Sequence, residues 1–199
     1  MAAIATAADR TPDRVRLPLE FDTGPLLEEV AAIPSEDWIR QPFKSNYEGA
    51  WDVVPLLAAA GEIHPLRLIY ANPSATRFLP TRWLDAMPAF EAALARFECP
   101  LRSVRLMRLA PGSKILEHCD DLDAQSGAIR LHVPLTTNPR VEFRLGGRPV
   151  PMAPGSVWYL RLSEPHSAGN EGTTARIHLV LDSAVNGWLA RMLSEGAPE

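Results

Sequence analysis

From residue 101 onward the sequence is a series of short apolar segments of strand length, each closed by a turn signal. Gly146 and Gly147 separate two such segments in the way a two-residue hairpin turn does. The segments that we expect to be strands are residues 104–109, 128–135, 141–145, 149–152, 156–162 and 175–182. Many short strands at near-regular spacing predict a mainly β fold, either a sandwich or a small barrel.

The first hundred residues carry helical signals instead. Thr23 can cap a helix that begins at Pro25. The apolar stripe of this helix would consist of Leu26, Leu27, Val30 and Ile33. A second helix fits residues 88–97, whereas residues 41–72 are rich in Pro, Gly, Asn and aromatic residues and favour irregular loops with short strands.

These segments suggest one domain with a tail. We expect a flexible tail over residues 1–16 and a single domain over residues 17–199. Within the domain, residues 17–100 would form a part of helices and loops, and residues 101–182 the β core. Residues 183–199 would add a tail and a short C-terminal helix, which fits residues 185–193.

Composition limits the class of protein. The chain has 199 residues, 46% hydrophobic content, a net charge of −4 and no long apolar run. We therefore expect a soluble globular protein without a membrane patch or a basic face for nucleic acid. Its two cysteines are too few for a disulfide framework, and the N-terminus lacks the features of a signal peptide, so we expect a cytoplasmic location. The sequence leaves the oligomeric state open.

His118, Asp120 and His166 are the residues that most suggest chemistry. Side chains alternate along a strand, so His118 and Asp120 would share one side while Cys119 points to the other. Two imidazoles and one carboxylate leave the opposite face of a divalent metal open, which suits non-haem Fe(II) oxygenases. The alternative is that both histidines are surface or capping residues in loops.

Two arginines lie in similar strand segments, residues 130–135 and 176–181, each with a basic residue, an aliphatic residue and then a histidine. If Arg130 and Arg176 are buried, their guanidinium groups require a carboxylate or phosphate partner. The alternative places them on edge strands in water. His132 and His178 can equally be core histidines, His178 more so.

From about residue 104 to residue 182 the sequence resembles the aspartyl/asparaginyl β-hydroxylase family of Fe(II)- and 2-oxoglutarate-dependent oxygenases. It is also similar to bacterial free-proline hydroxylases. The resemblance is carried by six ordered blocks: RLAPGS at 108–113, EHCD at 117–120, IRLHVPL at 129–135, GSVWYL at 155–160, PHSAGN at 165–170 and ARIHLVLD at 175–182. Six blocks in one order are far more specific than three metal ligands alone.

The resemblance implies a double-stranded β-helix core of the jelly-roll or cupin-like kind, with N-terminal helices and a short C-terminal helix. It implies that three residues form the catalytic Fe(II) site and three contact the 2-oxoglutarate cosubstrate. The implied iron ligands are His118, Asp120 and His166, and the implied cosubstrate contacts are Arg176, Arg130 and His132. Met107 stands where some members have a serine for the cosubstrate, so its anchoring here would depend more on Arg176.

The expected reaction is O2-dependent hydroxylation of a C–H bond of an amino acid, free or peptide-bound, with release of succinate and CO2. The carboxylate of Asp120 favours hydroxylation over halogenation. Arg105 would either bind a substrate carboxylate or face solvent, and Tyr47 and Trp51 would line the mouth of the barrel. The alternatives are a cupin-like protein that binds a metal or a small molecule without 2-oxoglutarate turnover, or a purely structural β-sandwich.

Overall fold

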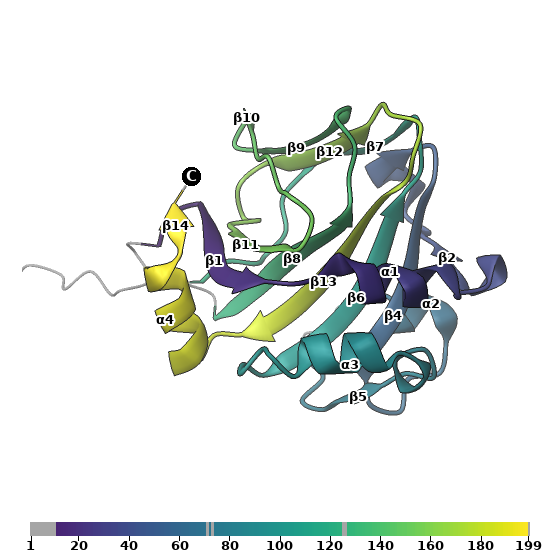
Figure 1. Cartoon of the computed structure of the whole chain (residues 1–199), viewed down its shortest axis with the longest axis horizontal. Coiled ribbons are helices and arrows are strands. Elements are labelled where there is room, and N and C mark those ends of the chain that lie inside the picture. The colour runs from purple at the N-terminus through teal and green to yellow at the C-terminus, as the bar shows by residue number, and fades with distance from the viewer. Residues whose placement is uncertain (1–10, 71, 73, 125–126, 199) are drawn as a thin grey trace, which may run out of the picture.

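A computed structural model of the protein describes residues 11–70, 72, 74–124 and 127–198. The described chain forms two antiparallel sheets that lie face to face (Figure 1). The order in the larger sheet is β14 (Ala197–Pro198), β1 (Arg14–Glu20), β11 (Ser156–Leu160), β8 (Ala128–Thr136), β13 (Arg176–Ala184), β6 (Leu101–Leu109), β4 (Trp51–Ala59) and β2 (Ile39–Arg40), with β5 (Phe78–Pro80) beside β4. The order in the smaller sheet is β10 (Arg148–Pro149), β9 (Val141–Leu145), β12 (His166–Asn170), β7 (Ser113–His118) and β3 (Tyr47–Glu48).

Short helices accompany the sheets. The α-helices are α1 (Thr23–Ala31), α2 (Pro65–Leu68), α3 (Pro88–Leu94) and α4 (Gly187–Glu195), and 3₁₀ helices lie at Ser35–Asp37, Lys44–Asn46 and Leu84–Ala86. The two long N-terminal helices and the C-terminal helix lie close to their predicted positions, although Asp22 rather than Thr23 caps α1 through its side chain. The described chain has no helix that is long and apolar enough to cross a membrane.

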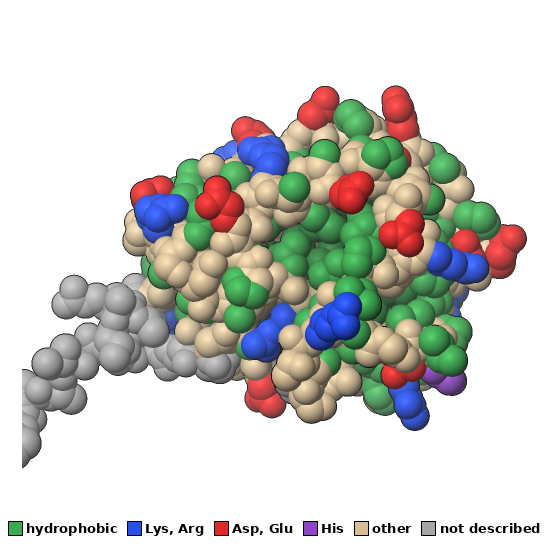
Figure 2. Space-filling model, turned by 90° about the horizontal axis from the view of Figure 1, so that it is seen from below, with side chains coloured by type: hydrophobic (Ala, Val, Ile, Leu, Met, Phe, Trp, Pro, Cys, Tyr) green, Lys and Arg blue, Asp and Glu red, His purple; other side chains and the backbone are tan. Residues whose placement is uncertain are grey.

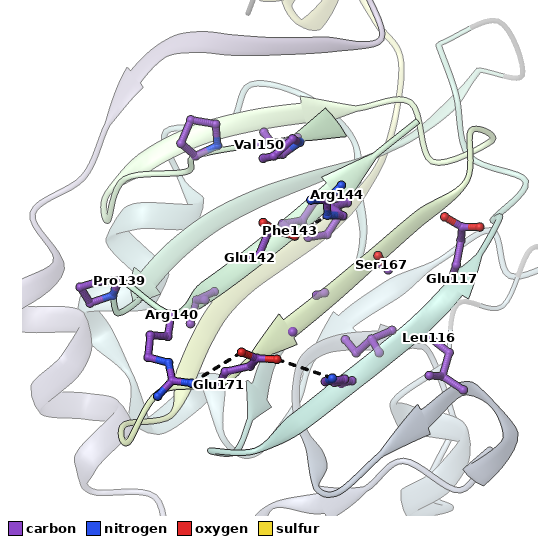
Figure 3. Close-up of a pocket in the computed structure, with 17 residues that line it drawn as sticks. Leu116, Glu117, Pro139, Arg140, Glu142, Phe143, Arg144, Val150, Ser167 and Glu171 are labelled. Atoms are coloured by element: carbon purple, nitrogen blue, oxygen red, sulfur yellow. Dashed lines mark hydrogen bonds and ion pairs between the residues drawn. The ribbon is translucent and has the colours of Figure 1, made fainter. Parts of the chain in front are cut away.

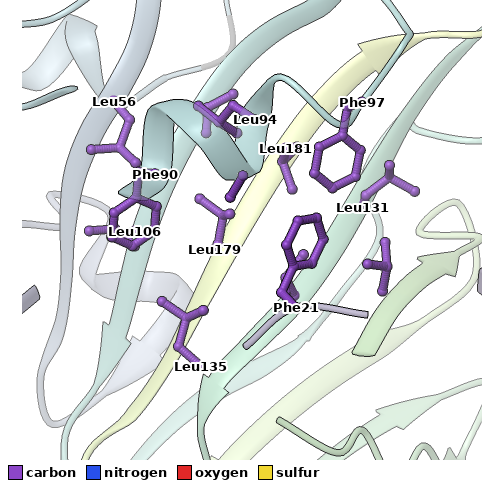
Figure 4. Close-up of a cluster of buried hydrophobic side chains, with 14 of the residues drawn as sticks. Phe21, Leu56, Phe90, Leu94, Phe97, Leu106, Leu131, Leu135, Leu179 and Leu181 are labelled. Carbon is purple, nitrogen blue, oxygen red and sulfur yellow. The ribbon is translucent and has the colours of Figure 1, made fainter. Parts of the chain in front are cut away.

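The main hydrophobic core lies between the larger sheet and the helices. Figure 4 shows Phe90 and Leu94 on α3, with Phe97 just beyond it, packed over the strands. The strand residues beneath them include Leu106, Leu131, Leu135, Leu179 and Leu181. Because side chains alternate along a strand, the residues between these leucines point toward the smaller sheet. That second face of the larger sheet is therefore the one available for a site.

The outer surface is mixed in character. Figure 2 shows the molecule from below, where hydrophobic side chains gather in a shallow hollow and acidic and basic side chains lie around it. Among the described residues, the large hydrophobic side chains with the greatest exposure are Ile63 and Phe43, at 88% and 56%.

Strand β1 corrects the predicted tail, because it begins at Arg14, within residues 1–16. Residues 1–10 lie outside the described residues. The strand pairs with β11, and Arg14 donates hydrogen bonds from Nη2 to the carbonyl of Leu145 at 3.0 Å and from Nη1 to that of Pro149 at 3.2 Å. These partners are more than 130 residues away in the chain. A local pattern carries no signal for such pairing.

Strand β4 corrects the expectation of irregular loops with short strands over residues 41–72, because it is a long strand of nine residues. It pairs with β6 through residues 51–57 and with β5 through residues 57–59, so the β core is not confined to residues 101–182. Pro55 argues against a strand at the sequence level, because proline cannot donate a hydrogen bond to a β-ladder and usually marks an edge strand or a bulge. The register of β4 against β6 shifts between Pro55 and Leu57, and this bulge accommodates the missing N–H group.

Gly155 provides a stability test of the turn before β11. Its φ is +81°, and a Cβ atom there would lie 2.2 Å from the carbonyl oxygen of Phe21. We expect Gly155→Ala to lower the free energy of unfolding by about 2–5 kcal/mol, from backbone strain and overpacking together. Gly146→Ala is the control, because Gly146 also has positive φ but open space around it, and should cost only about 1–2 kcal/mol. Urea denaturation measures both, and equal losses would contradict the close approach to Phe21.

Candidate active site

The structure brings His118, Asp120 and His166 together at one end of the smaller sheet. One ligand atom from each residue lies within 4.8 Å of the others. His118 ends β7, His166 begins β12, and the two face each other in register with ring centroids 4.2 Å apart. The arrangement is that of a site for one divalent metal ion.

Each imidazole is oriented by a backbone carbonyl two residues earlier. Nδ1 of His118 donates to the carbonyl of Leu116 at 2.8 Å, and Nδ1 of His166 donates to that of Glu164 at 3.1 Å. A carbonyl oxygen can only accept, so Nδ1 carries the proton and Nε2 is left as the metal-binding nitrogen in both rings. Both histidines are thus held in the tautomer that a metal needs.

A β-bulge, rather than simple alternation, aims His118 at the site. Opposite β12, Ala168 pairs with Ile115 and His166 with His118, so β7 has one extra residue in this interval. The bulge turns His118 to the same inner side as Ile115. Asp120 lies beyond the strand end, where its N–H donates to the carbonyl of Leu162 at 2.7 Å. The expectation that one regular strand carries both ligands was therefore wrong.

Cys119 is exposed and is not part of the metal-binding group. His166 is the first residue of β12 and is buried, so it is not a surface or capping residue in a loop. The exposed position of Cys119 and the strand position of His166 are both compatible with the group formed by His118, Asp120 and His166.

A buried network of charges adjoins Asp120. Arg130 donates from Nη1 to Oδ2 of Asp120 at 2.6 Å and from Nε to Oδ1 of Asp182 at 2.6 Å. Arg105 also forms an ion pair with Asp182, and its Nη1 donates to the carbonyl of Ile69 at 3.0 Å. Burial alone would raise the pKa of Asp182, but the charges of Arg105 and Arg130 outweigh burial and lower it. Arg105 is only 3% exposed, so its predicted alternative of facing solvent was wrong.

Arg176 is a buried cation without an acidic partner. It is 3% exposed, its Nη2 donates to Nδ1 of His178 at 3.0 Å, and its Nε has no partner. Within the described residues no carboxylate forms an ion pair with it. Burial lowers the pKa of the Arg176 guanidinium. A cation in such surroundings is costly unless an anion binds beside it, so Arg176 is suited to an acidic ligand.

His132 offers two further unused polar atoms. Both of its ring nitrogens are buried without a hydrogen-bond partner among the described residues. The ring lies between His178 and Phe143, at centroid distances of 5.8 and 5.7 Å. Burial, with the charges of Arg176 and Arg130, holds its pKa well below the usual 6.5. Neutral His132 can therefore donate or accept a hydrogen bond to a ligand between the sheets.

A cavity of about 300 Å³ reaches Arg176 and His178. Phe143 and Met152 are among its apolar lining residues. Its size falls at the lower end of small-molecule sites. A larger concavity of about 680 Å³ lies over the outer face of the smaller sheet, where Glu171 pairs with Arg140 at 3.6 Å (Figure 3). The three candidate metal ligands line neither this concavity nor the smaller cavity. Phe143, which lines the smaller cavity, connects the two groups between the sheets, because its ring centroid lies 6.0 Å from the Arg176 guanidinium and 6.1 Å from the ring of His166.

Tyr47 and Trp51 were expected at the mouth of the barrel. Tyr47 is buried, and its hydroxyl donates to the carbonyl of Gln41 at 2.6 Å. The ring of Trp51 meets that of Tyr47 edge to face, with the centroids 5.9 Å apart. Trp51 also packs against two apolar clusters between the sheets, one containing Leu109 and Phe143 and the other Val53 and Met107. The indole Nε1 of Trp51 is buried without a partner among the described residues. Trp51 thus has a free donor for a ligand, whereas the Tyr47 hydroxyl is already used.

The buried histidines predict loss of stability in acid. Burial first, then the charge of Arg176, holds the pKa of His178 well below 6.5. The unfolded chain binds a proton below 6.5 while the folded protein does not, so stability falls as the pH falls below that value. Each such histidine contributes a slope of about 1.4 kcal/mol per pH unit below about pH 5.5. We expect His178→Gln to reduce the slope by that amount in urea denaturation of the metal-free protein. An unchanged slope would show that His178 is protonated in the folded state.

The fold and the three adjacent ligands define the class of double-stranded β-helix proteins with a metal-binding His, Asp, His set. Within that class, the chain belongs to the aspartyl/asparaginyl β-hydroxylase family, whose model matches residues 25–185. This confirms the family that the six sequence blocks indicate.

Comparison with individual proteins agrees with this membership. The L-proline cis-4-hydroxylase of Rhizobium meliloti strain 1021 is 26% identical over 170 residues, 82% of this chain and 58% of that protein. The chain thus spans less than two thirds of that relative's length. A 2OG-Fe(II) oxygenase family oxidoreductase from Burkholderia pseudomallei has 18% identity and a TM-score of 0.56, covering 88% of this chain and 87% of that one. The non-haem α-ketoglutarate-dependent epimerase of nogalamycin biosynthesis has 17% identity and a TM-score of 0.53, covering 96% and 89%. This likeness concerns the fold, and it confirms the predicted double-stranded β-helix.

Proposed function

We propose that the protein is an Fe(II)- and 2-oxoglutarate-dependent dioxygenase that hydroxylates a C–H bond of an amino acid, free or peptide-bound. The observation that carries the proposal is the buried guanidinium of Arg176, which pairs with no carboxylate of the described residues and lies beside the same Phe143 ring as His166 of the metal-binding group, at 6.0 and 6.1 Å from that ring. A simple metal binder has no use for such a cation. A dicarboxylate cosubstrate that also binds the metal explains both features.

His118, Asp120 and His166 fit Fe(II) as ligands, because two imidazoles and one carboxylate leave three coordination positions free. When Fe(II) is bound with 2-oxoglutarate and O2, it supplies the oxidising power for hydroxylation of an unactivated C–H bond. One oxygen atom enters the new hydroxyl group and the other enters succinate, with release of CO2. The protein's own part is to position the reactants and to exclude water.

Arg176 would hold the distal carboxylate of 2-oxoglutarate. The interior raises the strength of this ion pair, and a guanidinium can bind a carboxylate through two parallel hydrogen bonds. His132, with both ring nitrogens unpartnered, would donate to the cosubstrate beside it. Arg130, bound to Asp120, would face the end of the cosubstrate next to the metal.

The substrate proposal rests on the relatives and on the interior surface. The similar protein from Rhizobium meliloti is an L-proline hydroxylase, which favours an amino acid. Arg105 lies on the inner face beside the apolar cluster that contains Val53, Met107 and Val180. Arg105 shares the Asp182 carboxylate with Arg130, but its Nε has no partner among the described residues and would donate to the substrate carboxylate. Trp51, with Tyr47 packed against it, would form part of the wall.

Two measurements test the proposed function. Anaerobic addition of Fe(II) and 2-oxoglutarate should give a weak visible charge-transfer band. In air, amino acids and peptides are screened as substrates. At least one of them should stimulate succinate formation and be converted into a product that is 16 mass units heavier. The mass gain is needed because 2-oxoglutarate can be consumed without hydroxylation. A folded protein that binds Fe(II) but gives neither the band nor succinate would instead be a cupin-like binder.

A further inference from the structure

We infer that Arg130 and Asp182 are positioning residues that make Asp120 bind the metal through one oxygen, Oδ1. The inference rests on the proposed metal site but not on the identity of the substrate. Arg130 donates from Nη1 to Oδ2 of Asp120 at 2.6 Å, and within the described residues no hydrogen bond reaches Oδ1. With Oδ2 held by a cation and drawn toward Arg130, Oδ1 is the oxygen without a hydrogen-bond partner among the described residues and is favoured for the metal. One-oxygen binding keeps a coordination position open for the cosubstrate or O2.

Asp182 fixes Arg130 in the orientation that this contact requires. Arg130 binds it through two parallel hydrogen bonds, Nε to Oδ1 at 2.6 Å and Nη2 to Oδ2 at 3.2 Å. Such a fork sets the plane of the guanidinium, and therefore the direction in which Nη1 points. Asp182 is 4% exposed, so water does not compete for these bonds.

Asp182 also separates two positive charges. Arg105 and Arg130 both form ion pairs with the Asp182 carboxylate. Without this carboxylate the two buried guanidinium groups would repel each other, and Arg130 would lose its fixed position relative to Asp120. Partners that orient metal ligands typically change metal affinity 10- to 100-fold when removed. Asp182 would therefore act on the metal through Arg130, without touching it.

The test uses Co²⁺ and the metal-free full chain, with neither cosubstrate nor substrate. We expect Arg130→Met to raise the dissociation constant for Co²⁺ about 10- to 100-fold and Asp182→Asn to raise it about 10-fold. Infrared difference spectra, metal-loaded minus metal-free, report how a carboxylate binds. The parent should show the wide band splitting of one-oxygen coordination, and Arg130→Met a narrower splitting as Oδ2 also reaches the metal.

Asp52→Asn is the matched control. Asp52 is also buried, at 6% exposure, and is held by two arginines, Arg40 at 2.6 Å and Arg108 at 3.1 Å, but not at the metal site. Its replacement should leave the Co²⁺ dissociation constant within twofold of the parent.

An Arg130→Met protein that binds Co²⁺ as tightly as the parent, with unchanged carboxylate bands, overturns this inference but not the proposed function. An equal loss in Asp52→Asn and Asp182→Asn also overturns it, and a parent that binds no divalent metal overturns the proposed function. If Asp182→Asn fails to fold, Arg130→Met decides.

Discussion

Replacing Arg176 with methionine is expected to raise the Michaelis constant for 2-oxoglutarate roughly 30-fold to several thousand-fold. Truncating one partner of a buried, hydrogen-bonded charge pair costs about 2–5 kcal/mol, and each 1.4 kcal/mol is tenfold. Arg176 is 3% exposed and pairs with no carboxylate of the described chain, so the cosubstrate would supply its counter-charge. Succinate formation at increasing 2-oxoglutarate concentration measures the effect.

The specific control uses 2-oxopentanoate, which keeps the 2-oxo acid group but lacks the distal carboxylate. The parent should strongly prefer 2-oxoglutarate to this compound, whereas Arg176→Met should discriminate between them far less. Arg108→Met removes another partly buried arginine, one paired with Asp52 at 3.1 Å, and should leave the preference intact. An Arg176→Met protein with the parent's Michaelis constant would mean that the cosubstrate is held elsewhere.

The parts of the fold that could be predicted from the sequence are those governed by neighbouring residues. The strand over residues 141–145 was predicted to the residue, because Gly146 and Gly147 mark the hairpin that ends it. Strands β1 and β4 were missed for different reasons. β1 is specified by pairing with the distant β11, and Pro55 interrupts the apolar pattern of β4. Pairing between distant segments and tolerance of a proline at a bulge both depend on tertiary structure.

In the site, too, some features follow from the local sequence and others from tertiary structure. The three proposed metal ligands, which the structure brings together, were selected by residue type and block order. The bulge that aims His118 is instead a property of the β7 and β12 register. Asp182 ends the sequence block ARIHLVLD at 175–182, but no role was predicted for it. A signal for it was present, because residues 176, 178, 180 and 182 share one strand face, and this places a carboxylate on the side of Arg176. That Arg105 and Arg130 meet at Asp182 follows only from the order of β8, β13 and β6.

His166→Ala is expected to weaken binding of Fe(II) or Co²⁺ by more than about 100-fold, because the loss of a ligand should exceed the 10- to 100-fold cost of losing a partner that only orients one. His166 faces His118 across the strand pair, and its Nε2 is the free ring nitrogen. Turnover with 2-oxoglutarate should fall at least as far. Metal titration of the chelator-treated protein provides the direct measurement, and succinate formation the second.

The control for His166→Ala is a replacement of Cys119. Cys119 stands between His118 and Asp120 in the sequence, yet its thiol is exposed and lies outside the metal-binding group. Cys119→Ala should therefore bind metal as the parent does, whereas a thiolate ligand would make this replacement as damaging as His166→Ala. If His166→Ala retains the parent's affinity while Cys119→Ala loses it, the metal is held by a different set. The oxygenase proposal then loses its central support, because a thiolate in place of an imidazole favours softer metals than Fe(II).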